Sequence, residues 1–189
     1  MTVTLEKPAS EAKVFAMSRV FDASPELLWD VLTMPEHLSN WFGPPGATVK
    51  VASLDLTPGG TFLYGMPMPG GVTMWGKWVF RVIDKPKTLA YVVSFCNEQG
   101  VPVRHPMAPL WPLEVLAIQT LTPQAPSSSE AVGQNNIKTL YESRSYPINC
   151  TPEERAVFTA GHASMTMGFS GTFMALEAYL AKLKQGSAA

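Results

Sequence analysis

Three histidines and one arginine are the residues of this chain whose chemistry is most versatile. His162 falls within an apolar repeat near the C-terminus, and Arg104 and His105 stand together in a proline-rich stretch. An imidazole exchanges protons near neutral pH, and a guanidinium holds a carboxylate through two hydrogen bonds. His37 belongs to a short amphipathic segment, where we expect it at the surface.

Each of these polar residues has two interpretations. His162 is either a core histidine with a satisfied hydrogen bond or a cavity-facing group that orients a ligand. Arg104 either forms an ion pair with Glu114 or Glu142 that fixes its loop, or meets the polar end of a ligand together with His105. The ion pair is the preferred interpretation of Arg104, and both alternatives stay open for His162.

Motifs for metal binding and nucleophilic catalysis are not found. The sequence has no Cys-x-x-Cys, His-Glu-x-x-His or paired acidic motif, so we expect neither a metal nor a cofactor. Cys96 and Cys150 are expected to be reduced, structural thiols. Ser164 and Ser170 lie among small residues, where packing explains them. No catalytic residue is assigned.

Large apolar side chains are numerous and suggest the wall of a pocket. Each one singly is best explained as core, but together they would suit a flat or apolar molecule. The candidate ligand-binding residues are Trp41, Phe42, Tyr64, Met66, Trp75, Trp78, Tyr91, Phe95, Trp111, Met165, Phe169 and Phe173, with Arg104, His105 and His162 as further polar groups. Tyr91 is the expected polar anchor within the wall, and Met74 and Met167 would add plasticity.

These residues need elements that bring them together, and the first is one long C-terminal helix. Thr151 can cap it, Pro152 suits the first turn, and Glu154 completes a capping box. An apolar stripe follows at steps of three and four: Phe158, His162, Met165, Phe169, Phe173, Leu176, Leu180 and Leu183. Glycines such as Gly161 and Gly168 predict that the helix backbone lies close to a partner.

The segments before this helix read mainly as strands. After a loose arm at 1–12, a strand at 13–22 leads into two short helices that start at Ser24-Pro25 and Met34-Pro35. Six strands are predicted next: 48–56, 61–66, 72–83, 88–96, 113–122 and 136–146. The stretch 97–112 is too long for a hairpin turn and is expected to be functional or lid-like. We predict a single domain over 13–185.

Composition narrows the class of protein. The 189 residues carry a net charge of −1 and only 15% charged side chains, which excludes a typical nucleic-acid surface. The 46% apolar content includes no run long enough to insert into a membrane, and the N-terminus has no signal-peptide pattern. We therefore expect a cytoplasmic protein, and the apolar content makes a homodimer conceivable.

Several motifs carry a family resemblance. They are Phe21-Asp22-Ala23-Ser24-Pro25-Glu26-Leu27-Leu28-Trp29, Pro35-Glu36-His37-Leu38, Trp41-Phe42-Gly43-Pro44, Leu56-Thr57-Pro58-Gly59-Gly60, Trp75-Gly76, Val103-Arg104-His105-Pro106, Gly161-His162 and Gly168-Phe169. With the order of elements, they resemble the START-like (SRPBCC) superfamily and, within it, homologues of the heat-shock-protein-90 ATPase activator. The resemblance implies an α+β helix-grip fold, in which a curved antiparallel sheet wraps a long C-terminal helix and encloses a cavity.

Three functions are compatible with such a fold, because fold does not determine function. The preferred hypothesis is a binding protein that holds an apolar or aromatic small molecule between sheet and helix. The second is a cyclase, hydratase or hydrolase for an aromatic or polyketide-like substrate, with a histidine as general acid or base. The third, suggested by the family name, is a co-chaperone that stimulates a heat-shock ATPase.

Overall fold

One curved antiparallel sheet forms the body of the protein. The computed structural model describes residues 14–43, 49–68, 70–124 and 137–186, so the predicted arm at 1–12 lies outside the described residues. The strands are β1 (Phe15–Phe21), β2 (Lys50–Leu54), β3 (Thr61–Pro67), β4 (Thr73–Asp84), β5 (Thr88–Cys96), β6 (Glu114–Gln124) and β7 (Lys138–Ile148). They pair in the order β1-β7-β6-β5-β4-β3-β2, and each neighbouring pair is antiparallel.

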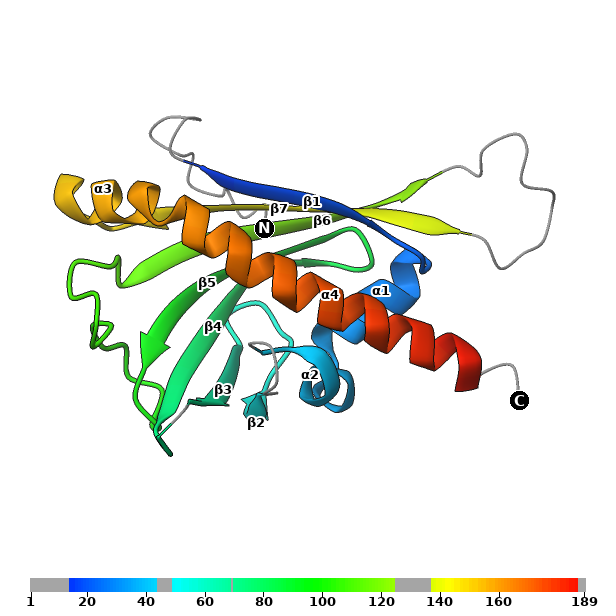
Figure 1. Cartoon of the computed structure of the whole chain (residues 1–189), viewed down its shortest axis with the longest axis horizontal. Coiled ribbons are helices and arrows are strands. Elements are labelled where there is room, and N and C mark those ends of the chain that lie inside the picture. The colour runs from blue at the N-terminus through cyan, green and yellow to red at the C-terminus, as the bar shows by residue number, and fades with distance from the viewer. Residues whose placement is uncertain (1–13, 44–48, 69, 125–136, 187–189) are drawn as a thin grey trace.

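The curvature of the sheet has local causes. The register shifts between Val51 and Ser53 in β2 and between Phe80 and Val82 in β4. An extra residue in one strand bends that strand and increases its twist. Figure 1 shows the result, a sheet that curves around the C-terminal helix, and the predicted α+β helix-grip architecture is confirmed.

Two short helices close one end of the sheet. They are α1 (Pro25–Thr33) and α2 (Pro35–Trp41). Ser24 caps α1 by accepting a hydrogen bond from the Leu27 amide at 3.2 Å, as the Ser-Pro start predicts. The Trp41 indole donates to the Val31 carbonyl at 3.0 Å, which holds α2 against α1.

The predicted single C-terminal helix is two helices in succession. They are α3 (Pro152–Ala160) and α4 (His162–Gly186), with Gly161 between them. Thr151 and Glu154 form the expected capping box at the start of α3. The prediction of one uninterrupted helix was wrong because Gly161, which has weak helix propensity, ends α3 where a large side chain lies against its backbone. Figure 1 shows α4 crossing the concave face of the sheet.

The two halves of α4 are attached to the fold very differently. Its buried residues are Phe173, close to the midpoint of the helix, and Leu176 and Leu180 in the second half. Two hydrogen bonds of 2.7 Å from Arg19 of β1 to the Glu177 carboxylate add an ion pair to that half. The first half, from His162 to Thr172, contributes no fully buried residue.

Two more polar contacts tie the second half of α4 to the rest of the domain. Lys184 pairs with Asp22 at 2.6 Å, and His37 Nδ1 lies 2.8 Å from the Tyr179 hydroxyl. His37 of α2 is half-buried against α4, whereas the sequence predicted a position at the surface. In the described residues, no helix combines the length and the apolar character that a bilayer crossing requires.

Candidate functional site

A cavity of about 270 Å³ lies between the concave face of the sheet and the helices that cover it. It is lined by Leu32, Trp41, Phe42, Tyr64, Met66, Gly76, Trp78, Tyr91, Val93, Ser94, Phe95, Trp111, Pro112, Val115, Ala117, Gln119, Tyr141, Ser143, Ser145, Phe158, Met165, Phe169, Thr172 and Phe173. Its volume is close to the lower end of the range of small-molecule pockets, about 300–1,000 Å³.

The wall of this cavity is apolar and uncharged. None of the described residues that line it is an aspartate, glutamate, lysine, arginine or histidine. The polar side-chain groups are indole N–H groups of tryptophan, hydroxyls of tyrosine, serine and threonine, and the single carboxamide of Gln119. A wall of this composition suits an apolar ligand that is positioned by a few hydrogen bonds.

Aromatic rings of β3, β4 and β5 form the most closely packed side of the cavity. The Trp78 and Tyr91 rings stack with centroids 4.0 Å apart, and Phe42 meets Trp78 edge-on at 5.4 Å. Gly76 makes this arrangement possible, because a Cβ there would lie 2.4 Å from the Tyr64 ring on the paired strand. A glycine within a strand commonly marks such a close approach.

Burial raises the pKa values of the three cavity tyrosines above the ordinary value. Desolvation raises the pKa of Tyr64 to about 12, opposed by a hydrogen bond with Trp78. The pKa of Tyr91 rises well above its usual value through burial and then through the neighbouring Tyr141 and Tyr64. Burial also raises the pKa of Tyr141. These three phenols therefore stay uncharged to a higher pH than an exposed tyrosine, and at neutral pH they can make hydrogen bonds as neutral groups.

The Gln119 carboxamide is the most unusual polar group in the wall. Its Nε2 donates a 2.7 Å hydrogen bond to the Tyr91 hydroxyl. Its Oε1 is buried and has no hydrogen-bond partner among the described residues. Gln119 was not among the residues predicted for the site.

Most of the predicted apolar site residues do line this cavity. They are Trp41, Phe42, Tyr64, Met66, Trp78, Tyr91, Phe95, Trp111, Met165, Phe169 and Phe173. Trp75 does not, because successive residues of β4 face opposite sides of the sheet and the positions of Gly76 and Trp78 face the cavity. Met74 and Met167 are also absent from the wall, and Met167 is 73% exposed.

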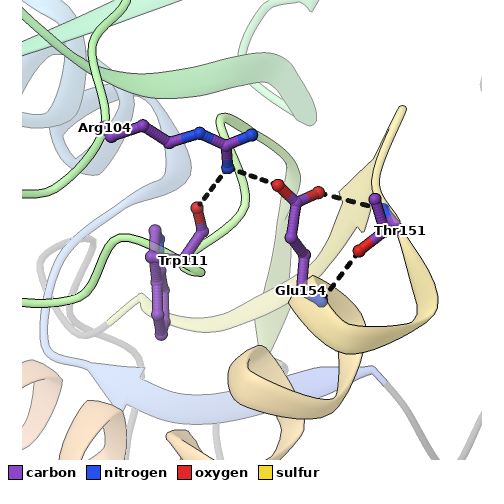
Figure 2. A network of polar contacts seen from close by, with 4 residues as sticks. All are labelled: Arg104, Trp111, Thr151 and Glu154. Atoms are coloured by element: carbon purple, nitrogen blue, oxygen red, sulfur yellow. Dashed lines mark hydrogen bonds and ion pairs between the residues drawn. The ribbon is translucent and has the colours of Figure 1, made fainter.

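Arg104 holds the loop instead of facing the cavity. It forms an ion pair with Glu154 at the start of α3 and donates a 3.2 Å hydrogen bond to the Trp111 carbonyl (Figure 2). The preferred interpretation as a structural ion pair is thus confirmed, but the predicted partners Glu114 and Glu142 were wrong. Glu114 instead accepts a hydrogen bond from Asn149.

Glu154 joins the loop, the capping box and α3. One carboxylate oxygen accepts from the Thr151 amide at 2.9 Å, and the other meets Arg104 (Figure 2). These contacts, with that to Thr151 first, lower the pKa of Glu154. The Arg104–Glu154 contact therefore fixes Trp111, which lines the cavity, beside the helix.

His105 and His162, like Arg104, lie outside the cavity wall. The His105 ring packs edge-on against Phe95 at 4.6 Å, and its Nδ1 accepts from the Met107 amide at 3.2 Å. The His162 ring lies 5.4 Å from that of Phe15 and 5.3 Å from that of Phe158. Its Nε2 is buried without a hydrogen-bond partner among the described residues, so neither interpretation of His162 describes it fully.

Comparison with known proteins now places the chain in a family. Residues 22–131 match the model for "Activator of Hsp90 ATPase homolog 1-like protein". The chain belongs to this family. No curated protein matches the sequence significantly.

Several solved structures are similar in fold to this chain. A protein from Arthrobacter aurescens has a TM-score of 0.69 and 25% identity, with 96% of this chain and 93% of that chain covered. A protein from Mycobacterium smegmatis has a TM-score of 0.66 and 21% identity, with 95% of this chain and 97% of that chain covered. A protein from Silicibacter pomeroyi that is described as AHSA1 has a TM-score of 0.62 and 15% identity, with 89% of this chain and 97% of that chain covered. These similarities show that the chain shares its fold with the three proteins.

Sequence reasoning overlooked the polar residues that this family member places in the wall. Gln119, Tyr141, Ser143 and Ser145 belong to β6 and β7, whose predicted strands were considered only as sheet. The signal was the alternation of Val115, Ala117 and Gln119, which share one face of β6. Only the order of the strands shows that this face is the concave one.

Proposed function

We propose that this member of the family binds an apolar or aromatic small molecule in the cavity between the sheet and α4. The observation that carries the proposal is the uncharged, aromatic wall around a space of about 270 Å³. Well-packed interiors hold few voids larger than a water molecule. A space of this size, with polar groups at a few points only, has the character of a ligand site.

Enzymatic use of a cavity histidine has less support. General acid or base catalysis requires a titratable group within hydrogen-bond reach of the substrate. The described wall contains no histidine or carboxylate, and its tyrosines have pKa values raised by burial. This composition favours the binding protein over the histidine-dependent enzyme.

A dye-binding experiment tests the proposal. Ala117 lines the cavity on β6, and Thr120 belongs to the alternate face of the same strand. We expect the neutral dye 1-aminoanthracene to bind the native protein with one saturable site. Ala117→Leu should weaken binding at least about tenfold by filling the space, while the control Thr120→Leu should leave it unchanged.

Unchanged dye binding by a folded Ala117→Leu protein would contradict the proposal, because the dye would then sit elsewhere. Native mass spectrometry followed by denaturing extraction complements this test. A discrete small molecule released on denaturation would identify the chemical class of the natural ligand. Stimulation of a heat-shock ATPase by the native protein, retained in Ala117→Leu, would instead support the co-chaperone hypothesis.

A further inference from the structure

The unpaired carboxamide oxygen of Gln119 constrains the chemistry of the ligand. Gln119 is only 8% exposed, lines the cavity, and leaves Oε1 without a partner among the described residues. A buried polar atom that lacks a hydrogen bond costs roughly 1–3 kcal/mol. A ligand that supplies the missing bond would remove this cost and gain affinity and orientation.

Tyr91 presents a second hydrogen-bonding group beside this oxygen. Its hydroxyl accepts from Gln119 Nε2 at 2.7 Å, which leaves the hydroxyl hydrogen as a donor for another partner. A ligand hydroxyl can therefore donate to Gln119 and accept from Tyr91. If the carboxamide is turned over, the same hydroxyl accepts from Gln119 and donates to Tyr91, so the match does not depend on the assignment of oxygen and nitrogen.

The rest of the wall excludes a charged ligand. No lysine, arginine or histidine is among the described lining residues, and Arg104 is already paired with Glu154 outside the cavity. A carboxylate in this space would lose its hydration without gaining a cation, which is strongly unfavourable. The earlier idea of Arg104 as a carboxylate anchor therefore does not apply.

We propose that the ligand is an uncharged molecule with an apolar ring skeleton and one hydroxyl group, and that this hydroxyl lies between Gln119 and Tyr91. The inference rests on the proposed binding function and specifies its ligand class. The hydroxyl fixes the orientation of the molecule, and the aromatic wall supplies most of the contact area.

Three naphthalenes of similar shape test the inference by titration of tryptophan fluorescence or by calorimetry. They are 2-naphthol, 2-methylnaphthalene, which replaces the hydroxyl by a methyl group, and 2-naphthoate, which carries a charge. The informative quantity is the ratio of the two neutral ligands' dissociation constants. We expect Gln119→Leu to weaken the binding of 2-naphthol about tenfold relative to that of 2-methylnaphthalene. We also expect 2-naphthoate to bind the native protein at least about tenfold more weakly than 2-naphthol.

Tyr91→Phe is a second variant that keeps the inference testable if Gln119→Leu fails to fold, and it should shift the ratio in the same direction. A ratio unchanged in a folded variant, or naphthoate binding as tight as naphthol binding, would overturn the hydroxyl inference while the binding function stands. If none of the three compounds binds the native protein, the proposed function itself fails.

Discussion

At the scale of single residues, glycines determine how closely side chains approach the backbone. A Cβ at Gly161 would lie 3.0 Å from the Trp111 ring, whereas one at Gly168 would meet nothing within 4 Å. The expectation of close packing is therefore right for Gly161 and wrong for Gly168. The two positions form a natural pair for mutation.

We expect Gly168→Ala to raise the free energy of unfolding by about 0.5–1 kcal/mol, because alanine favours an exposed helix interior. Gly161→Ala should give no such gain, since its methyl group would press on Trp111. Urea denaturation of both variants measures the difference. Equal stabilisation by both substitutions would contradict the close approach of Trp111 to Gly161.

At the scale of elements, an ion pair and a ring contact join the segment 97–112 to α3. Arg104 reaches the Glu154 carboxylate and the Trp111 carbonyl, and the Glu154 residue is only 5% exposed. The segment was predicted to be functional or lid-like. In the structure, His105 of this segment packs against the Phe95 ring, and Trp111 lines the cavity. Arg104 holds the segment in place.

Arg104→Gln should loosen this segment. We expect faster amide hydrogen exchange in residues 97–112 and at the start of α3, together with a lower melting temperature, because Glu154 loses its cationic partner. Lys85→Gln is the control, since it removes an exposed ion pair with Asp30 that is worth at most about 1 kcal/mol. Exchange in 97–112 that is equal in the two variants would show that Arg104 does not hold the segment.

At the scale of the whole molecule, three buried phenols make stability depend on alkaline pH. The pKa of Tyr64 is raised to about 12 from an ordinary value of 10.0. A raised pKa means that the folded state is favoured fully below pH 10 and loses this contribution as the pH rises towards 12. For Tyr64 alone the contribution is about 3 kcal/mol.

We therefore expect the native protein to lose stability steeply between pH 10 and pH 12, and Tyr64→Phe to show a shallower loss there. Thermal unfolding at a series of pH values, compared at equal ionic strength, measures both curves. Parallel curves for the two proteins would mean that Tyr64 is hydrated, and so ionises normally, in the folded state.

Local patterns in the sequence predicted the strands, the helix starts and most of the apolar wall, and the family resemblance predicted the helix-grip arrangement. Ser24 and Thr151 begin their helices as caps, and the aromatic residues follow strand and helix periods. What these patterns missed depends on partners distant in sequence. Arg104 meets Glu154, and Gln119 meets Tyr91, only after the sheet has brought their elements together.

The uneven distribution of buried residues along α4 has a consequence for the evolution of this protein. Phe173, Leu176 and Leu180 secure the helix, whereas the cavity residues Met165 and Phe169 belong to the half that contributes no fully buried side chain. We expect substitutions of Met165 or Phe169 to reshape the cavity at a lower cost in folding than substitutions of the fully buried Leu176 or Leu180. Selection can thus alter ligand preference on one half of a helix while the other half preserves the fold.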